Sequence, residues 1–420
     1  MIKIINSLND IHKRSTEISL EIENLTREII SEVRQNGDSA LYKYAEQFDK
    51  AKLTTLEVSV NEMKSAMDRL DPEYINLIKR CIKNIEDFHR NQIQNGFITE
   101  QNSVILGQKI TPIEKVGLYV PGGKAFYPST VLMNVIPAKL AGCKQIVVVS
   151  PPKPDGNIAD EILACAYLTG VSKFYKIGGA GAIAALAYGT ETIDKVYKIT
   201  GPGNAFVASA KKQVFGEVDI DMIAGPSEIL IIADENNDAR IVAGDLLSQA
   251  EHDPMASSIL VTTSEKLAKD VQLELENQMS KLPREEICRA SIGDNSYIIL
   301  VKDLDEAFEF SNEIAPEHLE IMLDDAFIYL PKVQNAGSIF LGRNTPEPLG
   351  DYYAGVNHTL PTNGTAKFSS ALSVDSFVKK STFVYYTETA LRDAKDDIAA
   401  FAMSEGLCAH ARSILNRFDK

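Results

Sequence analysis

The spacing of apolar positions changes along the chain from a helical pattern to an alternation of strands and helices. Asp71 and Pro72 open a stretch in which isoleucines recur every three or four positions, which predicts a capped amphipathic helix. Upstream, Ser59 and Glu62 have the spacing of a capping box before a shorter helix. We therefore expect residues 1–110 to be mainly helical.

From residue 111 onward, short β-rich runs alternate with helical patterns. The alternation runs to about residue 233 and then restarts with a helix over 238–252 and further strands as far as SIFLG at 338–342. This rhythm predicts parallel sheets covered by helices on both faces. The fold class is therefore α/β with two related domains, followed by a strand and a helix after about residue 376.

Composition limits the function classes. The 420 residues are too many for one core, and the net charge of −15 disfavours nucleic acid or an anionic membrane as a partner. The longest apolar runs fall short of the roughly 20 residues that span a bilayer. The five cysteines are scattered without a C-x-x-C pair, which indicates reduced thiols and a cytoplasmic protein.

The stretch DLLSQAEHDP predicts the end of a helix that begins near Asn237 and stops at Pro254. Gln249 and His252, three positions apart, would project together from an otherwise apolar helix. Taken alone, a pair of this kind is more often a solvated face with a capping histidine than a functional site.

Four of the six histidines stand beside acidic, amide or turn residues: His252, His318, His358 and His410. Few histidines in such settings indicate acid–base chemistry or metal binding. No short metal-binding motif is present, so a site would have to be assembled from distant segments.

Two glycine-rich loops join a predicted strand to a predicted helix. GAGAIA at 179–184 matches the dinucleotide fingerprint formally, but the acidic residue expected about 20 positions later is missing. GPGNAF at 201–206 places Asn204 at a helix N-cap, with its backbone N–H groups at the ligand-binding edge of the sheet. We rank the second loop higher.

Seven segments together resemble the histidinol dehydrogenase family. They are VGLYVPGG (116–123), GPGNAF (201–206), AGPSEILIIAD (224–234), DLLSQAEHD (245–253), APEHL (315–319), GDYYAGVNHTLPT (350–362) and EGLCAH (405–410). The resemblance implies a zinc-dependent, homodimeric enzyme that oxidises L-histidinol to L-histidine via L-histidinal with two NAD⁺, the last step of histidine biosynthesis. It also implies two incomplete Rossmann-like domains with a helical N-terminal arm and a small C-terminal extension.

The resemblance assigns a domain to each part of the chain. The expected organisation is an N-terminal region partly packed on the substrate domain (1–110), an NAD-binding Rossmann-like domain (111–233), a second one with the zinc and catalytic residues (234–376), and a tail that enters the active site, across the dimer (377–420).

The resemblance also implies roles for residues that match the motifs. The zinc ligands would be Gln249, His252, Asp351 and His410. The acid–base pair would be Glu317 and His318. The substrate would contact Ser227, His318, His358, Glu405 and the four zinc ligands, and NAD would contact Tyr119 and Asn204.

Gly181 departs from the family pattern, which usually reads GGAQAIAA and has a glutamine that touches NAD. Gly181 lacks that amide, so no cofactor role is carried onto it. Glu405 and His410, five positions apart, can line one site only if the helix is interrupted at Gly406 or if the two residues approach the ligand from different sides.

Three other functions remain open. The first is a related dehydrogenase that acts on another small diol or amino alcohol. The second is a zinc hydrolase in which Glu317 activates a metal-bound water without a cofactor. The third is a catalytically silent metal-binding protein.

Overall fold

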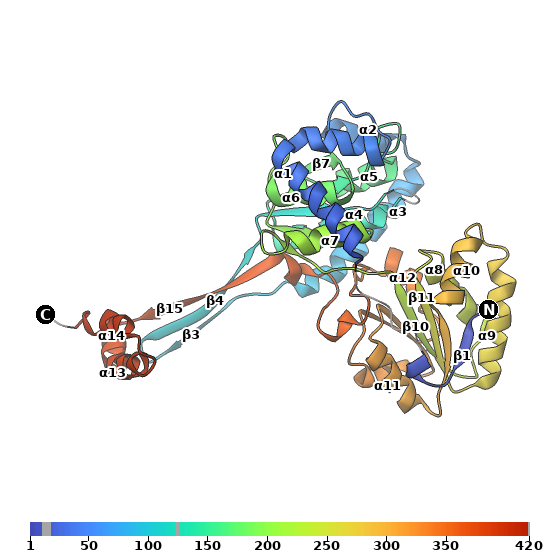
Figure 1. Cartoon of the computed structure of the whole chain (residues 1–420). Helices are drawn as coiled ribbons and strands as arrows, with labels where there is room; N and C mark the ends of the chain where they lie inside the picture. The colour runs from blue at the N-terminus through green and yellow to red at the C-terminus, as the bar shows by residue number, and fades with distance from the viewer. Residues whose placement is uncertain (11–17, 123–125, 419–420) are drawn as a thin grey trace. The chain divides into compact units, whose positions relative to one another are not determined.

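The computed structural model describes residues 1–10, 18–122 and 126–418. The described chain groups into two compact units, one formed by 1–92 with 113–377 and the other by 93–112 with 378–420 (Figure 1). The two units are groups of residues that contact one another densely, a grouping that does not test the domain boundaries expected from the sequence. Those boundaries stay predictions.

The first sheet of the larger unit has six strands and is parallel except for one edge strand. Its order is β2 (Glu57–Val58), β7 (Lys173–Lys176), β6 (Gln145–Ser150), β5 (Lys115–Tyr119), β8 (Lys198–Thr200) and β9 (Asp219–Ile220), with β2 antiparallel to β7. Its connecting helices are α4 (Pro128–Ala141), α5 (Asp160–Thr169), α6 (Gly179–Tyr188) and α7 (Ala205–Val214). Buried side chains form one hydrophobic cluster on each face of this sheet.

The N-terminal helices pack on the connecting helices of this first sheet. They are α1 (Leu20–Phe48), α2 (Val60–Arg69) and α3 (Pro72–His89). The capping box of Ser59 and Glu62 and the N-cap at Asp71 are both formed, which confirms these two sequence predictions. The same region adds β2 to the first sheet and β1 (Lys3–Ile5) to the second, two short strands that the helical pattern did not indicate.

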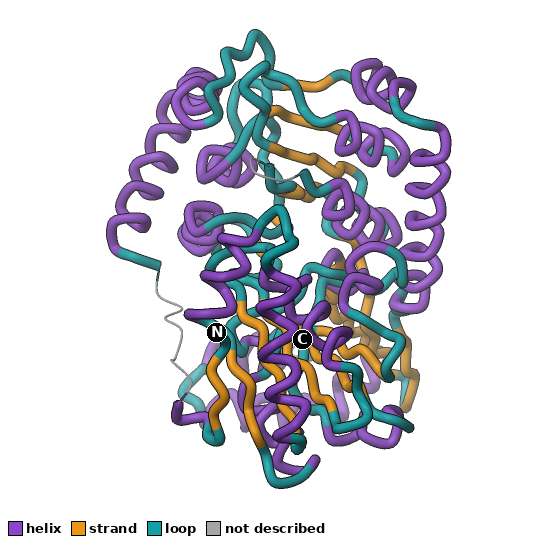
Figure 2. Tube along the Cα trace, turned by 90° about the vertical axis from the view of Figure 1, so that its right-hand side faces the viewer, coloured by secondary structure: helices purple, strands orange, loops and turns teal. Residues whose placement is uncertain are grey.

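The second sheet is entirely parallel. Its order is β1, β12 (Tyr297–Leu300), β11 (Ser257–Thr262), β10 (Glu228–Ala233), β13 (His318–Met322) and β14 (Ser338–Leu341). The accompanying helices are α8 (Ala239–Ala250), α9 (Glu265–Met279), α10 (Glu285–Asp294), α11 (Leu304–Ile314) and α12 (Glu347–Tyr352). Every residue of β10, β11 and β13 is buried, as expected for parallel strands covered on both faces. Figure 2 shows the strands with helices packed alongside them.

The smaller unit is a three-stranded antiparallel sheet followed by two helices. Its elements are β3 (Phe97–Gln101), β4 (Val104–Pro112), β15 (Val378–Tyr386), α13 (Glu388–Ser404) and α14 (Cys408–Leu415). The β3–β4 hairpin lies in a range that we expected to be mainly helical. β4 pairs with β15 along its whole length, so a partner far along the chain decides its structure.

The two sheets and the connecting helices confirm the α/β class with two parallel-sheet halves, a helical N-terminal region and a small C-terminal extension. None of the described helices combines the length and apolarity needed to cross a membrane.

Candidate functional site

The candidate residues gather at two different sheet edges. Tyr119 ends β5 and the GPGN loop follows β8, so both lie at the carboxyl edge of the first sheet, where α/β folds usually bind ligands. Glu317 and His318 instead stand at the amino end of β13 in the second sheet. The acid–base candidates therefore lie at the edge opposite to the one where α/β sheets usually bind ligands.

His318 is held in one tautomer. Its Nδ1 lies 2.9 Å from the backbone oxygen of Glu228, and because a carbonyl oxygen can only accept, Nδ1 carries the proton. Its Nε2 is buried and has no hydrogen-bond partner within the described parts of the chain. Burial lowers the pKa of His318 below its usual value, against the opposing charge of Asp351. A neutral imidazole with a free Nε2 lone pair is equipped to accept a proton.

Glu317 is buried directly beside the imidazole. Its Oε2 accepts a hydrogen bond of 2.8 Å from the Glu228 amide. Burial raises the pKa of Glu317 well above its usual value, and nearby carboxylates add to the shift. Since the Nδ1 proton of His318 is directed to Glu228, Glu317 at 3.7 Å does not orient the ring as the aspartate of a serine-protease triad would.

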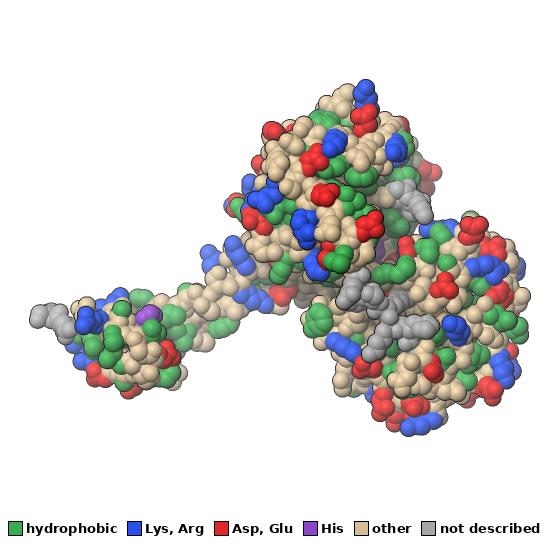
Figure 3. All heavy atoms as spheres, in the orientation of Figure 1, with side chains coloured by type: hydrophobic (Ala, Val, Ile, Leu, Met, Phe, Trp, Pro, Cys, Tyr) green, Lys and Arg blue, Asp and Glu red, His purple; other side chains and the backbone are tan. Residues whose placement is uncertain are grey.

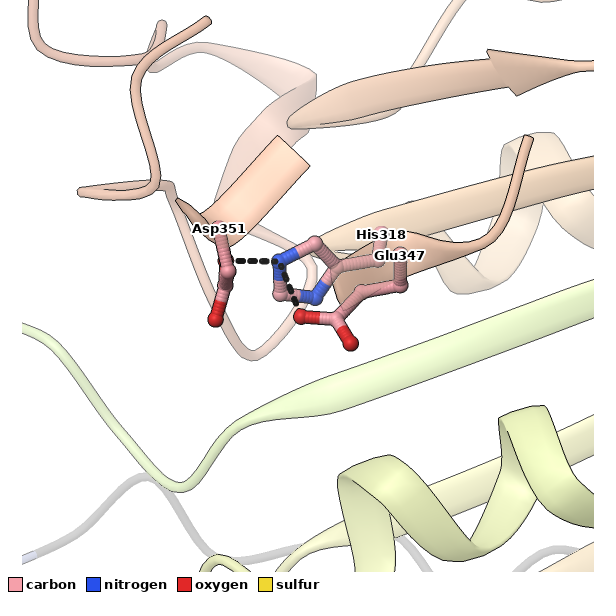
Figure 4. Close-up of side chains that lie close together, drawn as sticks. All are labelled: His318, Glu347 and Asp351. Atoms are coloured by element: carbon pink, nitrogen blue, oxygen red, sulfur yellow. Dashed lines mark ion pairs between the residues drawn. The ribbon is translucent and has the colours of Figure 1, made fainter. Parts of the chain in front are cut away.

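The free Nε2 of His318 faces two carboxylates of α12. It lies 3.7 Å from Glu347 Oε1 and 3.9 Å from Asp351 Oδ1, and Figure 4 shows the ring directed at both. Ligand atoms of these three residues lie within 4.8 Å of one another, a spacing that could hold a metal ion. Burial, with the neighbouring Asp351, raises the pKa of Glu347 to about 9. A bound cation would reverse that shift.

Sequence reasoning missed Glu347. Its only signal was the spacing of four between Glu347 and Asp351, which puts both carboxylates on one face of a helical turn. In the sequence EPLGDY that spacing is indistinguishable from an ordinary solvated pair. Its burial, at 2% exposure, is what identifies Glu347 as part of the site.

Gln249 is completely buried on α8, and neither atom of its amide has a hydrogen-bond partner in the part of the chain that the structure describes. Leaving a buried amide unpaired costs about 1–3 kcal/mol, so such a group is typical of a ligand site. The unpaired amide of Gln249 and the unpaired Oε1 of Glu347 offer oxygen ligands of a kind that zinc accepts.

His252 does not lie on the helix, contrary to the prediction. α8 ends at Ala250, and the His252 amide bonds to the backbone oxygen of Gln249 in a turn. The helix thus closes with a tighter i→i−3 bond before Pro254 can interrupt it. The turn still keeps His252 close enough to add to the lowering of the pKa of His318 and His358, which is caused mainly by burial.

Of the remaining substrate candidates of the larger unit, His358 flanks the same cluster. His358 Nδ1 lies 3.8 Å from Asp351 Oδ1, and its Nε2 lies 3.5 Å from the Thr130 hydroxyl. Burial lowers the pKa of His358. Ser227 is half-buried immediately before β10.

Behind the cluster, Asp245 of α8 and Glu320 of β13 form a buried carboxyl pair. Glu320 Oε1 accepts a 2.6 Å hydrogen bond from the Glu347 amide. Its Oε2 finds no donor among the described residues. The Glu320 and Asp245 carboxyls share a hydrogen bond, which requires a proton on one of them. The pair joins the elements that carry Gln249, His318 and Asp351.

This pair predicts a pH-dependent stability of the metal-free protein. Burial raises the pKa of Asp245 to about 6 and that of Glu320 to about 8, above the ordinary 3.8 and 4.5. The folded protein therefore keeps protons that the unfolded chain releases. The stabilisation is fully present below about pH 4, near the ordinary pKa values, and is lost as pH rises from there through about 8. Glu320→Gln keeps both hydrogen bonds without titrating, so its Tm should fall less across this range. Equal slopes for the two proteins would contradict a shared proton.

At the first sheet, the two cofactor candidates have different settings. The Tyr119 hydroxyl is buried and accepts a 3.1 Å hydrogen bond from the Gly179 amide, and burial raises its pKa to about 12. Asn204 is exposed and caps α7 by accepting from two backbone amides. Residue 123 of the VGLYVPGG segment lies outside the described residues.

Glu405 and His410 belong to the smaller unit, whereas the other candidates belong to the larger one. The helix is interrupted at Gly406, which has φ +77°, between the end of α13 and the start of α14. Both side chains are exposed and line one surface hollow that also includes Phe401 and Leu407.

Two sheet halves, with a glycine-rich loop at the carboxyl edge of one and an imidazole–carboxylate centre at the amino edge of the other, are features of an α/β enzyme that uses acid–base chemistry. The family model for histidinol dehydrogenase matches residues 12–418. The chain therefore belongs to the histidinol dehydrogenase family and is an oxidoreductase.

Individual relatives agree with this assignment over nearly the whole chain. It is 52% identical to a histidinol dehydrogenase of Streptococcus mutans, over 100% of this chain and 98% of the relative. A histidinol dehydrogenase of Geobacillus kaustophilus is 54% identical, with 94% and 93% covered. The crystal structure of the Elizabethkingia anophelis histidinol dehydrogenase superposes with a TM-score of 0.94 at 40% identity, covering 99% of this chain and 98% of that one.

Proposed function

We propose that the protein oxidises L-histidinol to L-histidine via L-histidinal, with two NAD⁺ and a zinc ion, as the last step of histidine biosynthesis in the cytoplasm. The observation that carries this proposal is the neutral His318, whose free Nε2 faces a buried cluster of unpaired donors in a chain of this family. L-Histidinol carries an amino alcohol at one end and an imidazole at the other. Both groups can bind to a polar site that holds a metal ion.

The residues that would hold zinc are Gln249, His252 and Asp351, with His410 from a C-terminal tail. Bound Zn²⁺ would supply a Lewis acid and a template that orients the amino alcohol. Glu347 fits the same role from its place beside Asp351, because its Oε1 is buried and unpaired within the described chain. Ser227, His358 and Glu405 would complete the substrate contacts.

The proton transfers follow from the two neighbouring residues. His318 Nε2 takes the hydroxyl proton of the alcohol, and NAD⁺, when bound, supplies the hydride acceptor. Glu317, a carboxyl whose pKa is raised by burial and which stands directly beside His318 in the sequence, activates the water that hydrates the aldehyde. His318 then accepts a proton again during the second oxidation.

This division predicts an unequal effect of Glu317→Gln on the two oxidations. The amide cannot activate water, whereas the alcohol step needs only His318. Turnover with L-histidinal supplied as substrate should therefore fall much further than the first NADH formed from L-histidinol, by roughly 10²-fold or more. Equal losses in both halves would contradict separate roles for Glu317 and His318.

Tyr119 and Asn204 would contact NAD at the carboxyl edge of the first sheet, in a site that lacks the family's glutamine at position 181. A Cβ at 181 would meet Leu41 and Tyr44 of α1 at 3.6 and 3.7 Å, which is ordinary packing distance. Position 181 therefore has room for at least the start of a side chain.

Gly181→Gln should lower KM for NAD⁺ by about fivefold, the value of one neutral hydrogen bond. The matched control is Gly181→Ala, which fills the same space without an amide. It should leave KM unchanged and stabilise α6 by about 0.5–1 kcal/mol. If the glutamine variant has the wild-type KM, the missing amide is not a cofactor contact.

We also propose a homodimer in which the tail of one subunit completes the site of the other. Its support is that Glu405 and His410 share a hollow in the smaller unit with exposed apolar side chains. Phe401, Leu407 and Ile398 are 71%, 42% and 37% exposed there, and Figure 3 shows hydrophobic side chains on this part of the surface. Such exposure is typical of a surface that another chain covers.

The decisive assay is purified protein with L-histidinol and NAD⁺, followed by NADH absorbance and product analysis. We expect two NADH per L-histidine formed. Activity on another small diol or amino alcohol instead would identify a related dehydrogenase. Absence of NADH with every alcohol tried would favour a zinc hydrolase.

A further inference from the structure

The loop Gly201–Asn204 is fixed by a buried ion pair that the catalytic scheme does not use. Lys211 of α7 and Asp221, immediately after β9, form an ion pair in which the two side chains are only 2% and 1% exposed. Burying both charges has a large unfavourable desolvation free energy. The attraction within the pair offsets it only where additional hydrogen bonds satisfy the remaining donors and acceptors of the two side chains.

Those additional hydrogen bonds go to a single residue of the loop. Lys211 Nζ donates to the backbone oxygen of Gly201 at 3.0 Å, and the Gly201 amide donates to Asp221 Oδ2 at 2.8 Å. Asp221 Oδ1 also accepts from the Met222 amide at 2.6 Å. The ion pair thus holds both backbone polar groups of Gly201 in a closed ring of contacts.

Gly201 in turn sets the approach of the loop to Tyr119. Its φ is +112°, and a Cβ there would collide with the Tyr119 backbone oxygen. Three residues later, Asn204 starts α7, the helix that carries Lys211. The loop is therefore clamped between the end of β5 and its own following helix.

We propose that Lys211 and Asp221 are positioning residues for the cofactor, which hold the Gly201 backbone so that the loop 201–204 and Tyr119 keep the arrangement that receives NAD⁺. The inference rests on the proposed cofactor role of Tyr119 and Asn204. Neither Lys211 nor Asp221 would touch the cofactor, because both side chains are enclosed by protein. Their contribution is to order the loop before NAD⁺ arrives, so that binding does not lose the conformational entropy of the loop.

The test is Lys211→Met in the full-length enzyme, with NAD⁺ affinity and KM for L-histidinol measured separately. Methionine keeps the apolar stem but cannot donate to Gly201, so the dissociation constant for NAD⁺ should rise about tenfold or more. KM for L-histidinol at saturating NAD⁺ should change less than about threefold. Deuterium uptake should increase in peptides covering 198–207. Unchanged NAD⁺ affinity would overturn the proposal.

Two further variants separate positioning from stability. In Lys211→Met/Asp221→Asn no charge is buried and the asparagine oxygen still accepts from the Gly201 amide, so thermal stability should partly return while NAD⁺ affinity stays low. Recovery of affinity together with stability would show that the pair only stabilises the fold. If Lys211→Met does not fold, this double variant and Asp221→Asn decide the question by the same measurements.

The matched control is Lys198→Met. Lys198 forms a 2.8 Å ion pair with Asp219 on the adjacent strands β8 and β9, with Lys198 9% and Asp219 49% exposed. Lys198→Met should leave the dissociation constant for NAD⁺ within about twofold of the wild-type value. A loss of affinity equal to that of Lys211→Met would mean that the effect is not specific to the loop.

Asn204→Ala distinguishes the positioning proposal from the proposed cofactor role of the loop. If Asn204→Ala leaves NAD⁺ affinity intact, the cofactor role of the loop fails. If Asn204→Ala weakens NAD⁺ affinity but Lys211→Met does not, only the positioning role of the ion pair fails.

Discussion

Replacing His318 with alanine is expected to lower kcat by about 10²–10⁴-fold, the usual contribution of a general base. The physical reason is the single tautomer of His318: its Nδ1 proton is held by Glu228, which leaves Nε2 as a free acceptor. Steady-state NADH formation at saturating L-histidinol and NAD⁺ measures the loss. Metal content and NAD⁺ affinity should remain close to those of the wild-type protein.

The pH profile tests the same role independently. Because burial lowers the pKa of His318, the imidazole stays neutral over the neutral range, and wild-type activity should fall on the acid side as Nε2 is protonated. His318→Ala should lose this acid limb, and added imidazole should restore part of the activity by entering the space that the side chain leaves. A loss of less than about tenfold with the acid limb retained would exclude His318 as the base.

Removing the residues after about 400 is expected to abolish activity and leave a folded core. Buried residues of the four hydrophobic clusters extend no further than Phe377, so the truncation removes none of them. It removes Glu405 and His410, a proposed substrate contact and a proposed zinc ligand. Cooperative thermal unfolding, zinc content and NADH formation measure the outcome. A fully active truncated protein would refute the role of the tail.

Mixing two inactive proteins shows in which subunit the tail acts. The truncated chain keeps His318 but lacks the tail, and the His318→Ala chain keeps the tail but lacks the base. If tails act across a dimer, a mixed dimer contains one complete site, and subunit exchange should restore activity. If each tail serves its own chain, the mixture stays inactive. Mixing the truncated protein with itself is the control.

Much of the secondary structure followed from local signals in the sequence. The capping box at Ser59 and the Asp71–Pro72 start are satisfied by neighbouring backbone groups, so their effect does not depend on distant contacts. The alternation of strands and helices after residue 111 predicted two parallel sheets for the same reason. Local signals failed where a distant partner decides the structure, as at the β3–β4 hairpin, where β4 pairs with β15.

The candidate site shows the same division. The sequence by itself determined the α/β class and, through motifs that resemble one family, the candidate residues Gln249, His318 and Asp351. Only the tertiary structure revealed Glu347, whose carboxylate meets the free nitrogen of His318, and Lys211, whose charge holds Gly201. A charged residue looks the same in a sequence whether it is solvated or buried. Burial and the partners that compensate it arise only when distant segments pack together.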